Sequence, residues 1–264
     1  MAYDLHDLTE VAHALADAAR AAILPYFRAT DLQTDNKLAG GYDPVTAADR
    51  AAEEAMRAVL AQRRPDDAVL GEEFGDTPGT SGLTWVLDPI DGTRGFVSGT
   101  PTWGVLIAVG PESGPILGLI DQPYIGERFI GAAGRAELIG PHGRGPITTR
   151  PPRDLSEATL FTTFPEVGTP ADRAGFEAVA RQVQLVRYGM DCYAYALVAA
   201  GQADLVIEAG LNAYDIQAPI ALIEAAGGVV TNWEGGPAHA GGRALAAANP
   251  EIHRAALDIL QAAR

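Results

Sequence analysis

The sequence contains a single cysteine, Cys192, and has no long apolar run. One cysteine excludes an intrachain disulfide, which is typical of proteins from reducing compartments. No stretch approaches the roughly 18 apolar residues that span a bilayer. The segment Met1–Glu10 lacks the order of basic and then apolar residues found in secretory signals. We therefore expect a soluble, cytoplasmic protein with no membrane partner.

Positive charge and histidine are also scarce. The chain has 34 acidic and 19 basic residues, which gives a formal charge of −15, and five histidines. A chain this acidic repels nucleic acid, so no nucleic-acid partner is expected. The histidines are not spaced as zinc ligands, which argues against a zinc hydrolase.

Apolar periodicity predicts helices and strands along all 264 residues. The predicted helices cover residues 7–27, 46–62, 172–184, 192–200, 215–226 and 250–263. The predicted strands cover residues 68–70, 84–87, 103–109, 116–120, 128–132, 136–139, 185–187, 204–207 and 229–230. Asp7 and Glu10 are the expected capping pair of the first helix. The polar segment Thr30–Tyr42 is predicted to be a mobile loop.

The stretch Pro141–Pro152, rich in Gly, Pro and Arg, is the predicted boundary between two halves. We assign residues 1–145 to an N-terminal half with most of the candidate ligands and residues 146–264 to a C-terminal half. Strands and helices alternate in the second half, which predicts a layered α/β unit.

Two carboxylates, Asp88 and Asp91, follow a predicted buried strand, with Pro89 between them. Active sites of α/β proteins gather at strand ends, and Pro89 fixes the backbone that holds the two side chains. A surface turn is the alternative for Asp-Pro and Asp-Gly dipeptides. Carboxylate oxygens at this place suit Mg²⁺.

Further carboxylates follow other predicted elements. Glu72 comes after the strand at 68–70 and converges on Asp88 if both strands share a sheet; a solvated loop is the alternative. Asp215 opens a predicted helix, where it could be a further ligand or only a cap, and periodicity does not choose between the two.

Three motifs in order resemble those of the inositol monophosphatase superfamily of metal-dependent, lithium-sensitive phosphatases, over essentially the whole chain. They are Gly71-Glu72-Glu73, Trp85-Val-Leu-Asp88-Pro-Ile-Asp91-Gly-Thr93, and Tyr214-Asp215-Ile-Gln-Ala218 followed by Glu224-Ala-Ala-Gly227-Gly228. The resemblance implies alternating α-β-α-β-α layers, two or three Mg²⁺ ions, hydrolysis of a small phosphate ester by metal-activated water, and a homodimer. Tyr214 stands where the family usually has Trp. We expect Pro219 to fall in the first turns of that helix, where a missing N–H costs little.

The resemblance also assigns roles. The metal ligands would be Glu72, Asp88, the Ile90 carbonyl, Asp91 and Asp215. Gly92 and Thr93 would hold the phosphate and orient the attacking water, with Asp49 paired to Thr93. Glu72, Thr93 and Asp49 form the predicted catalytic set. Lys37 would lie in the loop that covers the site.

Several details resemble the histidinol-phosphate phosphatase branch, among them Arg94 directly after Thr93 and the run Gly189-Met-Asp191-Cys-Tyr193. Histidinol phosphate carries an ammonium and an imidazole, so carboxylates such as Asp191 and Glu208 in the leaving-group pocket would suit it. Asp191 could equally be a helix cap. Arg94, Asp191, Glu208 and Asp215 complete the predicted substrate contacts, with Gly92 and Thr93.

The sequence leaves other functions open. One is an inositol-1-monophosphatase or a related sugar or nucleotide phosphatase. A phosphatase for bisphosphorylated nucleotides would need a second basic pocket, for which Arg94 and Arg187 are the only candidates. Another, of a different class, is a regulatory binding protein on the same fold.

The expected role of Asp91 as a metal ligand can be tested by mutation. Replacing Asp91 with Asn should abolish Mg²⁺-dependent phosphate release while the protein remains folded, because a ligand is lost and the shape is kept. Phosphate release and circular dichroism measure the two properties. Substantial Mg²⁺-dependent activity in a folded variant would contradict the assignment.

Overall fold

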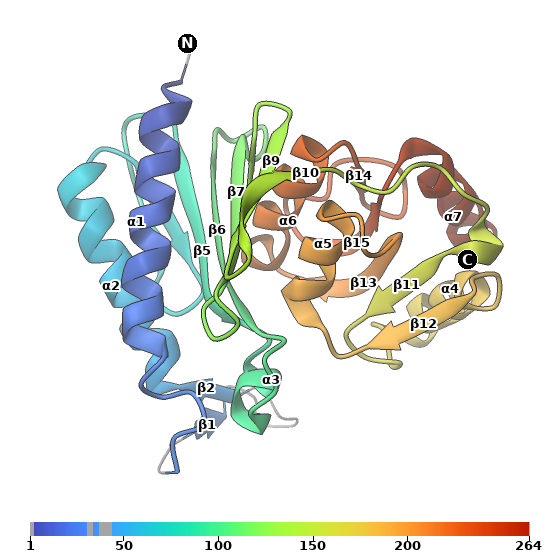
Figure 1. Ribbon diagram of the computed structural model, residues 1–264, viewed down its shortest axis with the longest axis horizontal. Helices are drawn as coiled ribbons and strands as arrows, with labels where there is room; N and C mark the ends of the chain where they lie inside the picture. Colours follow the sequence, from blue (N-terminus) through green and yellow to red (C-terminus); the bar gives the residue numbers. More distant parts are fainter. Residues whose placement is uncertain (1–2, 31–33, 37–43, 264) are drawn as a thin grey trace.

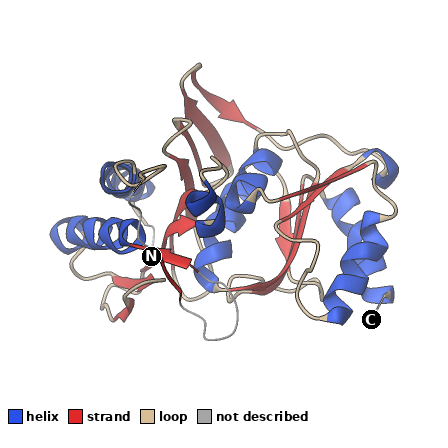
Figure 2. Ribbon diagram, turned by 90° about the horizontal axis from the view of Figure 1, so that it is seen from below, coloured by secondary structure: helices blue, strands red, loops and turns tan. Residues whose placement is uncertain are grey.

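The computed structural model describes residues 3–30, 34–36 and 44–263, and its helices and sheets alternate in five layers (Figures 1 and 2). The first layer is α1 (Leu5–Ile23) with α2 (Ala47–Arg63). The central helix layer is α5 (Asp191–Ala199) with α6 (Ala213–Ala225), and the last is α4 (Pro170–Ala180) with α7 (Pro250–Ala262). The predicted α-β-α-β-α layering is confirmed.

The larger sheet has eight strands and carries the candidate ligands. Its spatial order is β10 (Gly143–Ile147), β9 (Arg135–Gly140), β8 (Glu127–Ala132), β7 (Leu117–Gln122), β6 (Gly104–Gly110), β5 (Thr84–Asp91), β3 (Ala68–Gly71) and β4 (Gly75–Thr77). All neighbours are antiparallel except β3 and β5, which are parallel. The predicted division between residues 145 and 146 falls within β10.

The smaller sheet has the order β12 (Leu185–Tyr188), β11 (Thr159–Thr162), β13 (Leu205–Leu211), β15 (Gly242–Ala247) and β14 (Val229–Thr231). Side chains alternate across both sheets, as the strand period of two requires. On β5, Trp85 and Leu87 pack with α1 and α2, whereas Val86 packs with α5 and α6. Because residues of both sheets share the cluster around α5 and α6, one core joins the halves.

Most predicted elements are confirmed within a few residues, and the differences have physical causes. Asp4, and not the pair Asp7 and Glu10, caps α1: its carboxylate accepts the N–H groups of His6 and Asp7. Within the segment predicted as a loop, Thr34–Asn36 is the strand β1, paired with β2 (Pro44–Thr46), and Lys37 lies outside the described residues. The short helix α3 (Thr93–Ser98) and the strands β4, β10, β11 and β15 were not predicted.

Helix α6 approaches the large sheet unusually closely. A Cβ added at Gly118 on β7 would lie 2.2 Å from the Ala218 carbonyl oxygen, so only glycine allows this approach. Pro219 lies inside α6 and not in its first turns, so the prediction that it costs little was wrong: it cannot donate to the Asp215 carbonyl four residues earlier. Tertiary packing thus holds a helix that propensity alone disfavours.

A buried ion-pair network fixes the first helix layer to the sheet. Asp121 on β7 is fully buried and accepts from Arg20 of α1 (2.8 Å) and from Arg128 of β8 (2.7 Å). Arg128 also donates to the exposed Asp17 at 2.7 Å. Within the described part of the chain, no helix has both the length and the apolar character needed to cross a membrane.

This network generates a stability prediction. Asp121→Ala should lower the free energy of unfolding by about 3–5 kcal/mol, because the buried Arg128 and the partly buried Arg20 lose their shared buried counter-charge and Arg128 keeps only the exposed Asp17. Asp17→Ala is the control and should cost at most about 1 kcal/mol, since exposed pairs contribute little. Urea unfolding measures both. Similar decreases in the free energy of unfolding of the two variants would show that the buried Asp121 stabilises the fold no more than the exposed Asp17.

Candidate metal and active site

The end of β5 turns two carboxylates toward the same side of the sheet. Residues three apart on a regular strand point to opposite faces. Here Asp88 lies opposite Leu106 and Asp91 opposite Gly104, so β5 carries one residue more than β6 over this stretch. Such a bulge re-aims side chains, and Pro89, which has no N–H to pair, fits within it. The Ile90 N–H donates to Asp88 at 3.1 Å, which fixes that carboxylate.

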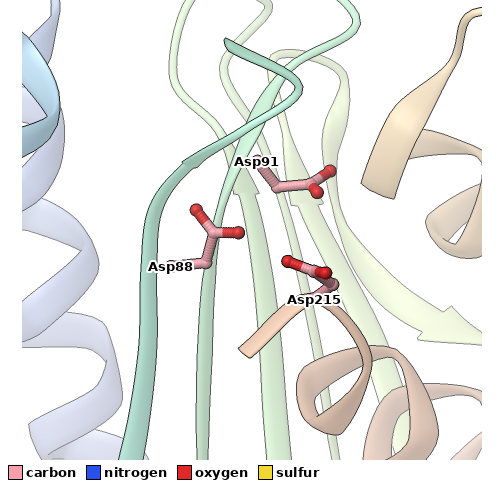
Figure 3. Close-up of side chains that lie close together, drawn as sticks. All are labelled: Asp88, Asp91 and Asp215. Carbon is pink, nitrogen blue, oxygen red and sulfur yellow. The ribbon is translucent and has the colours of Figure 1, made fainter. Parts of the chain in front are cut away.

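A third carboxylate comes from α6. Asp88, Asp91 and Asp215 each offer an oxygen within 4.8 Å of the others, and the three side chains lie close together where β5 ends and α6 begins (Figure 3). Asp215 also accepts the N–H of Asn212, the N-cap of α6, at 2.6 Å. Asn212, and not Asp215, is therefore the N-cap of α6; Asp215 is the third residue of the helix, completes the capping box and also belongs to the cluster.

Glu72 also reaches this cluster. The parallel pairing of β3 and β5 places the Glu72 N–H 3.2 Å from the Leu87 carbonyl, immediately before Asp88. The predicted convergence of the two strand ends is confirmed. Glu72 is one of the charges that raise the pKa of Asp88.

The carboxylates strongly perturb one another. Burial, and then the charges of Glu72, Asp91 and Asp215, raise the pKa of Asp88 well above its usual range. Burial, and then Asp191 and Asp215, do the same to the pKa of Asp91, although a hydrogen bond from the Cys192 N–H (2.6 Å) opposes the shift. Burial is the main cause that raises the pKa of Asp215 to about 7.

The donor set fits a hard divalent cation. Its members are carboxylate oxygens, the ligands that Mg²⁺ prefers, and their mutual repulsion is relieved by either a proton or a cation. Asp88, Asp91 and Asp215 would hold such an ion, with Glu72 beside them; the Ile90 carbonyl stays a predicted ligand.

The sequence-predicted phosphate and water contacts lie in one place. Gly92, Thr93 and Arg94 line a cavity of about 350 Å³ together with the carboxylates above. The Thr93 hydroxyl donates to the Ile90 carbonyl at 3.0 Å. Asp49 is buried on the first turn of α2, and its pairing with Thr93 stays a prediction.

Asp191 and Glu208 line the same cavity. Asp191 has the left-handed φ of 46° at the start of α5, where Met190 occupies the cap position without a side-chain bond, so Asp191 does not act as the helix cap. Burial, and then Glu208, raise the pKa of Asp191 to about 7, whereas Arg94 opposes the shift. Burial also raises the pKa of Glu208, which accepts from Tyr195 (2.9 Å) and from the backbone and hydroxyl of Thr163.

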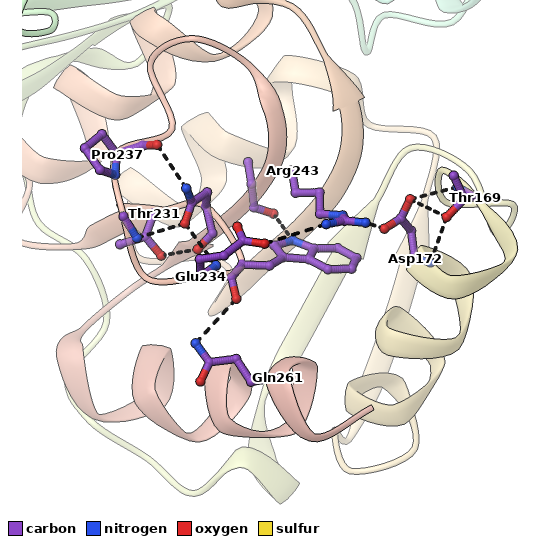
Figure 4. Close-up of polar contacts among 11 residues, drawn as sticks. Thr169, Asp172, Thr231, Glu234, Pro237, Arg243 and Gln261 are labelled. Atoms are coloured by element: carbon purple, nitrogen blue, oxygen red, sulfur yellow. Dashed lines mark hydrogen bonds and ion pairs between the residues drawn. The ribbon is translucent and has the colours of Figure 1, made fainter. Parts of the chain in front are cut away.

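Sequence reasoning missed the cavity wall formed by residues 162–168. Phe164 stacks under the Arg94 guanidinium at 4.6 Å, and Glu166 also lines the cavity. This segment leads into α4, where Asp172 accepts from Thr169 (2.8 Å) and from Arg243 of β15 (2.6 Å) (Figure 4). No local pattern marks residues 162–168, because their role depends on how β11 lies beside β13.

Comparisons with known proteins agree with this geometry. The family model described as "Inositol monophosphatase family" matches residues 4–264. The chain is 40% identical to the "Bifunctional phosphatase IMPL2, chloroplastic" of Arabidopsis thaliana, over 98% of this chain and 76% of that protein. It is 36% identical to the "Histidinol-phosphatase" of Mycobacterium tuberculosis, over 97% of this chain and 99% of that protein. An inositol monophosphatase structure from Zymomonas mobilis superposes with a TM-score of 0.86 at 36% identity, covering 98% of this chain and all of that chain (100%).

The raised pKa of Asp215 generates a prediction on pH. An unfolded Asp has a pKa of roughly 3.9. Between that value and about 7, the folded protein binds more protons than the unfolded one, so the stability of the metal-free protein falls as pH rises. Asp215→Asn removes this contribution and keeps an oxygen for the Asn212 N–H. In EDTA, the free energy of unfolding of this variant minus that of wild type should increase by at least about 1 kcal/mol from pH 4.5 to pH 8.

Urea unfolding at the two pH values measures this difference, with Asp76→Asn on the exposed part of β4 as the control. An equal effect of Asp215→Asn at both pH values would show that the cluster does not strain the metal-free fold.

Proposed function

Because the chain belongs to the inositol monophosphatase family, we propose that it hydrolyses L-histidinol phosphate to L-histidinol and phosphate with Mg²⁺ bound at Asp88, Asp91 and Asp215. The chain is a phosphoric monoester hydrolase. The choice among phosphate esters rests on the pocket, since the ligand cluster itself serves any of them.

The observation that carries this choice is the charge of the cavity lining. Seven acidic side chains line it against one basic side chain, Arg94, among the described residues. The acidic ones are Glu72, Asp88, Asp91, Glu166, Asp191, Glu208 and Asp215. Mg²⁺ would offset the charges of Asp88, Asp91 and Asp215 and of Glu72 beside them. That leaves Asp191, Glu208 and Glu166 to favour a cationic leaving group. Histidinol carries such a cation, whereas inositol offers only hydroxyls.

Different residues of the cavity would have different roles in the hydrolysis. Bound Mg²⁺ supplies charge neutralisation for the phosphate and a lowered pKa for a bound water. The only hydroxyl proton of Thr93 is donated to Ile90, so toward the cavity its oxygen accepts and can orient a water proton. Arg94, held over Phe164, favours an anion at the cavity mouth. The segment 162–168 forms a wall of the cavity, and Thr163 within it is fixed by its hydrogen bonds to Glu208.

Inositol 1-phosphate is the second candidate substrate. The inositol monophosphatase structure from Zymomonas mobilis is as similar to this chain as the histidinol-phosphatase relative, at 36% identity in both cases. Glu208 would favour histidinol phosphate by its charge, from a position that the donors Thr163 and Tyr195 fix.

The test compares kcat/KM for the two substrates in Mg²⁺, with wild type and Asp191→Asn. Wild type should prefer histidinol phosphate. The variant should lose at least about tenfold on that substrate, because a hydrogen-bonded contact to a charge contributes roughly 1.5–3 kcal/mol. Its kcat/KM on inositol 1-phosphate should change by less than about threefold. A wild-type preference for inositol 1-phosphate would overturn the proposal, and equal losses on both substrates would remove Asp191 from the leaving-group pocket.

A further inference from the structure

A buried carboxylate outside the cavity holds the turn that carries Glu72. Glu53 of α2 is fully buried and faces the turn between β3 and β4. One of its oxygens accepts the Glu73 N–H at 2.7 Å, and the other accepts the Phe74 N–H at 3.2 Å. The two N–H groups that directly follow Glu72 are thus tied to one side chain.

Arg57, one helical turn further along α2, completes the arrangement. Its guanidinium donates to the Glu53 carboxylate at 2.8 Å, to the Gly75 carbonyl, and to the Thr77 hydroxyl at 2.8 Å. Glu53 and Arg57 together therefore contact both ends of the turn Gly71–Gly75. The pair is charge-balanced, which a buried carboxylate requires.

The close approach of Glu53 also explains why a glycine, Gly71, precedes Glu72. A Cβ at Gly71 would lie 1.9 Å from a Glu53 carboxylate oxygen, so the carboxylate lies directly against the backbone. A side chain at this position would displace Glu53 or the turn.

We propose that Glu53 is a positioning residue, which holds the Gly71–Gly75 turn so that Glu72 reaches the metal beside Asp88. The inference rests on the proposed function, because it concerns the ion of that site. Glu53 does not line the cavity, so it acts only through the turn. Groups that orient metal ligands in this way typically contribute about 10–100-fold in metal affinity.

The experiment measures binding of Mn²⁺ alone by electron paramagnetic resonance, without substrate. Glu53→Gln puts an amide where one of the two N–H acceptors was, and should raise the Kd for Mn²⁺ at least about tenfold. Glu54→Gln, an exposed neighbour on the same helix, is the matched control and should leave the Kd unchanged. Glu53→Asp keeps the charge on a shorter side chain and should weaken binding to an intermediate degree; it also serves if Glu53→Gln folds poorly.

A double-mutant cycle with Glu72→Gln separates positioning from general destabilisation. If Glu53 acts through Glu72, Glu53→Gln should change the Kd less than about twofold in the Glu72→Gln background. A lower Tm in EDTA with an unchanged Kd, or an equal loss of affinity in both backgrounds, would overturn the proposal. Wild-type protein that binds no Mn²⁺ would overturn the proposed function as well, whereas tight wild-type binding with an unaffected Glu53→Gln would overturn this inference alone.

Discussion

Repulsion among one buried and two partly buried carboxylates is the constraint on which the rest of this structure depends. Asp88, Asp91 and Asp215 lie within 4.8 Å of one another, and burial together with neighbouring charge raises the pKa of each. Without a cation, ionisation of these carboxyl groups is less favourable in the folded chain than in the unfolded chain, which costs stability as pH rises. The fold must therefore supply rigidity from elsewhere, and its core joins both sheets around α5 and α6.

The β5 bulge and three hydrogen bonds from backbone N–H groups hold the carboxylate cluster in place. The bulge in β5 and the Ile90 N–H fix Asp88, the Cys192 N–H fixes Asp91, and the Asn212 N–H fixes Asp215. These donors partly offset the repulsion, because hydrogen bonds to the charged form lower a carboxyl pKa. Each of these bonds uses one carboxylate oxygen, so the other oxygen of each side chain is left for a cation (Figure 3).

Sequence reasoning found the parts of this site that depend on local order. The spacing of Asp88 and Asp91 around Pro89 lies within one turn, and Glu72 was placed by a simple rule about neighbouring strand ends. It could not choose between cap and ligand for Asp215, nor between cap and pocket for Asp191, because both choices depend on how α5 and α6 pack between the sheets. It missed Glu53 entirely, since a buried glutamate on an amphipathic helix has the same local pattern as an exposed one. The strand β15 was lost for a related reason: its small residues, Gly242–Ala247, owe their place to pairing with β13 and β14.

The two halves of the site have different physical requirements. To bind the proposed Mg²⁺, the side built from β3, β5 and the start of α6 would have to hold its carboxylates to within a fraction of an ångström, because that ion demands near-ideal geometry. The side built from Phe164 and Glu166 needs only the right sign of charge and enough room, so it can vary without disturbing the carboxylate cluster. Asp191 differs from these two, because its charge raises the pKa of Asp91. Glu208 lies between these regimes: it is fixed by Thr163 and Tyr195, yet its charge is felt by both Asp191 and Asp215. A change of leaving group is therefore expected to involve the exposed Phe164 and Glu166 first, whereas a change at Glu208 would affect both the proposed leaving-group pocket and the ligand cluster.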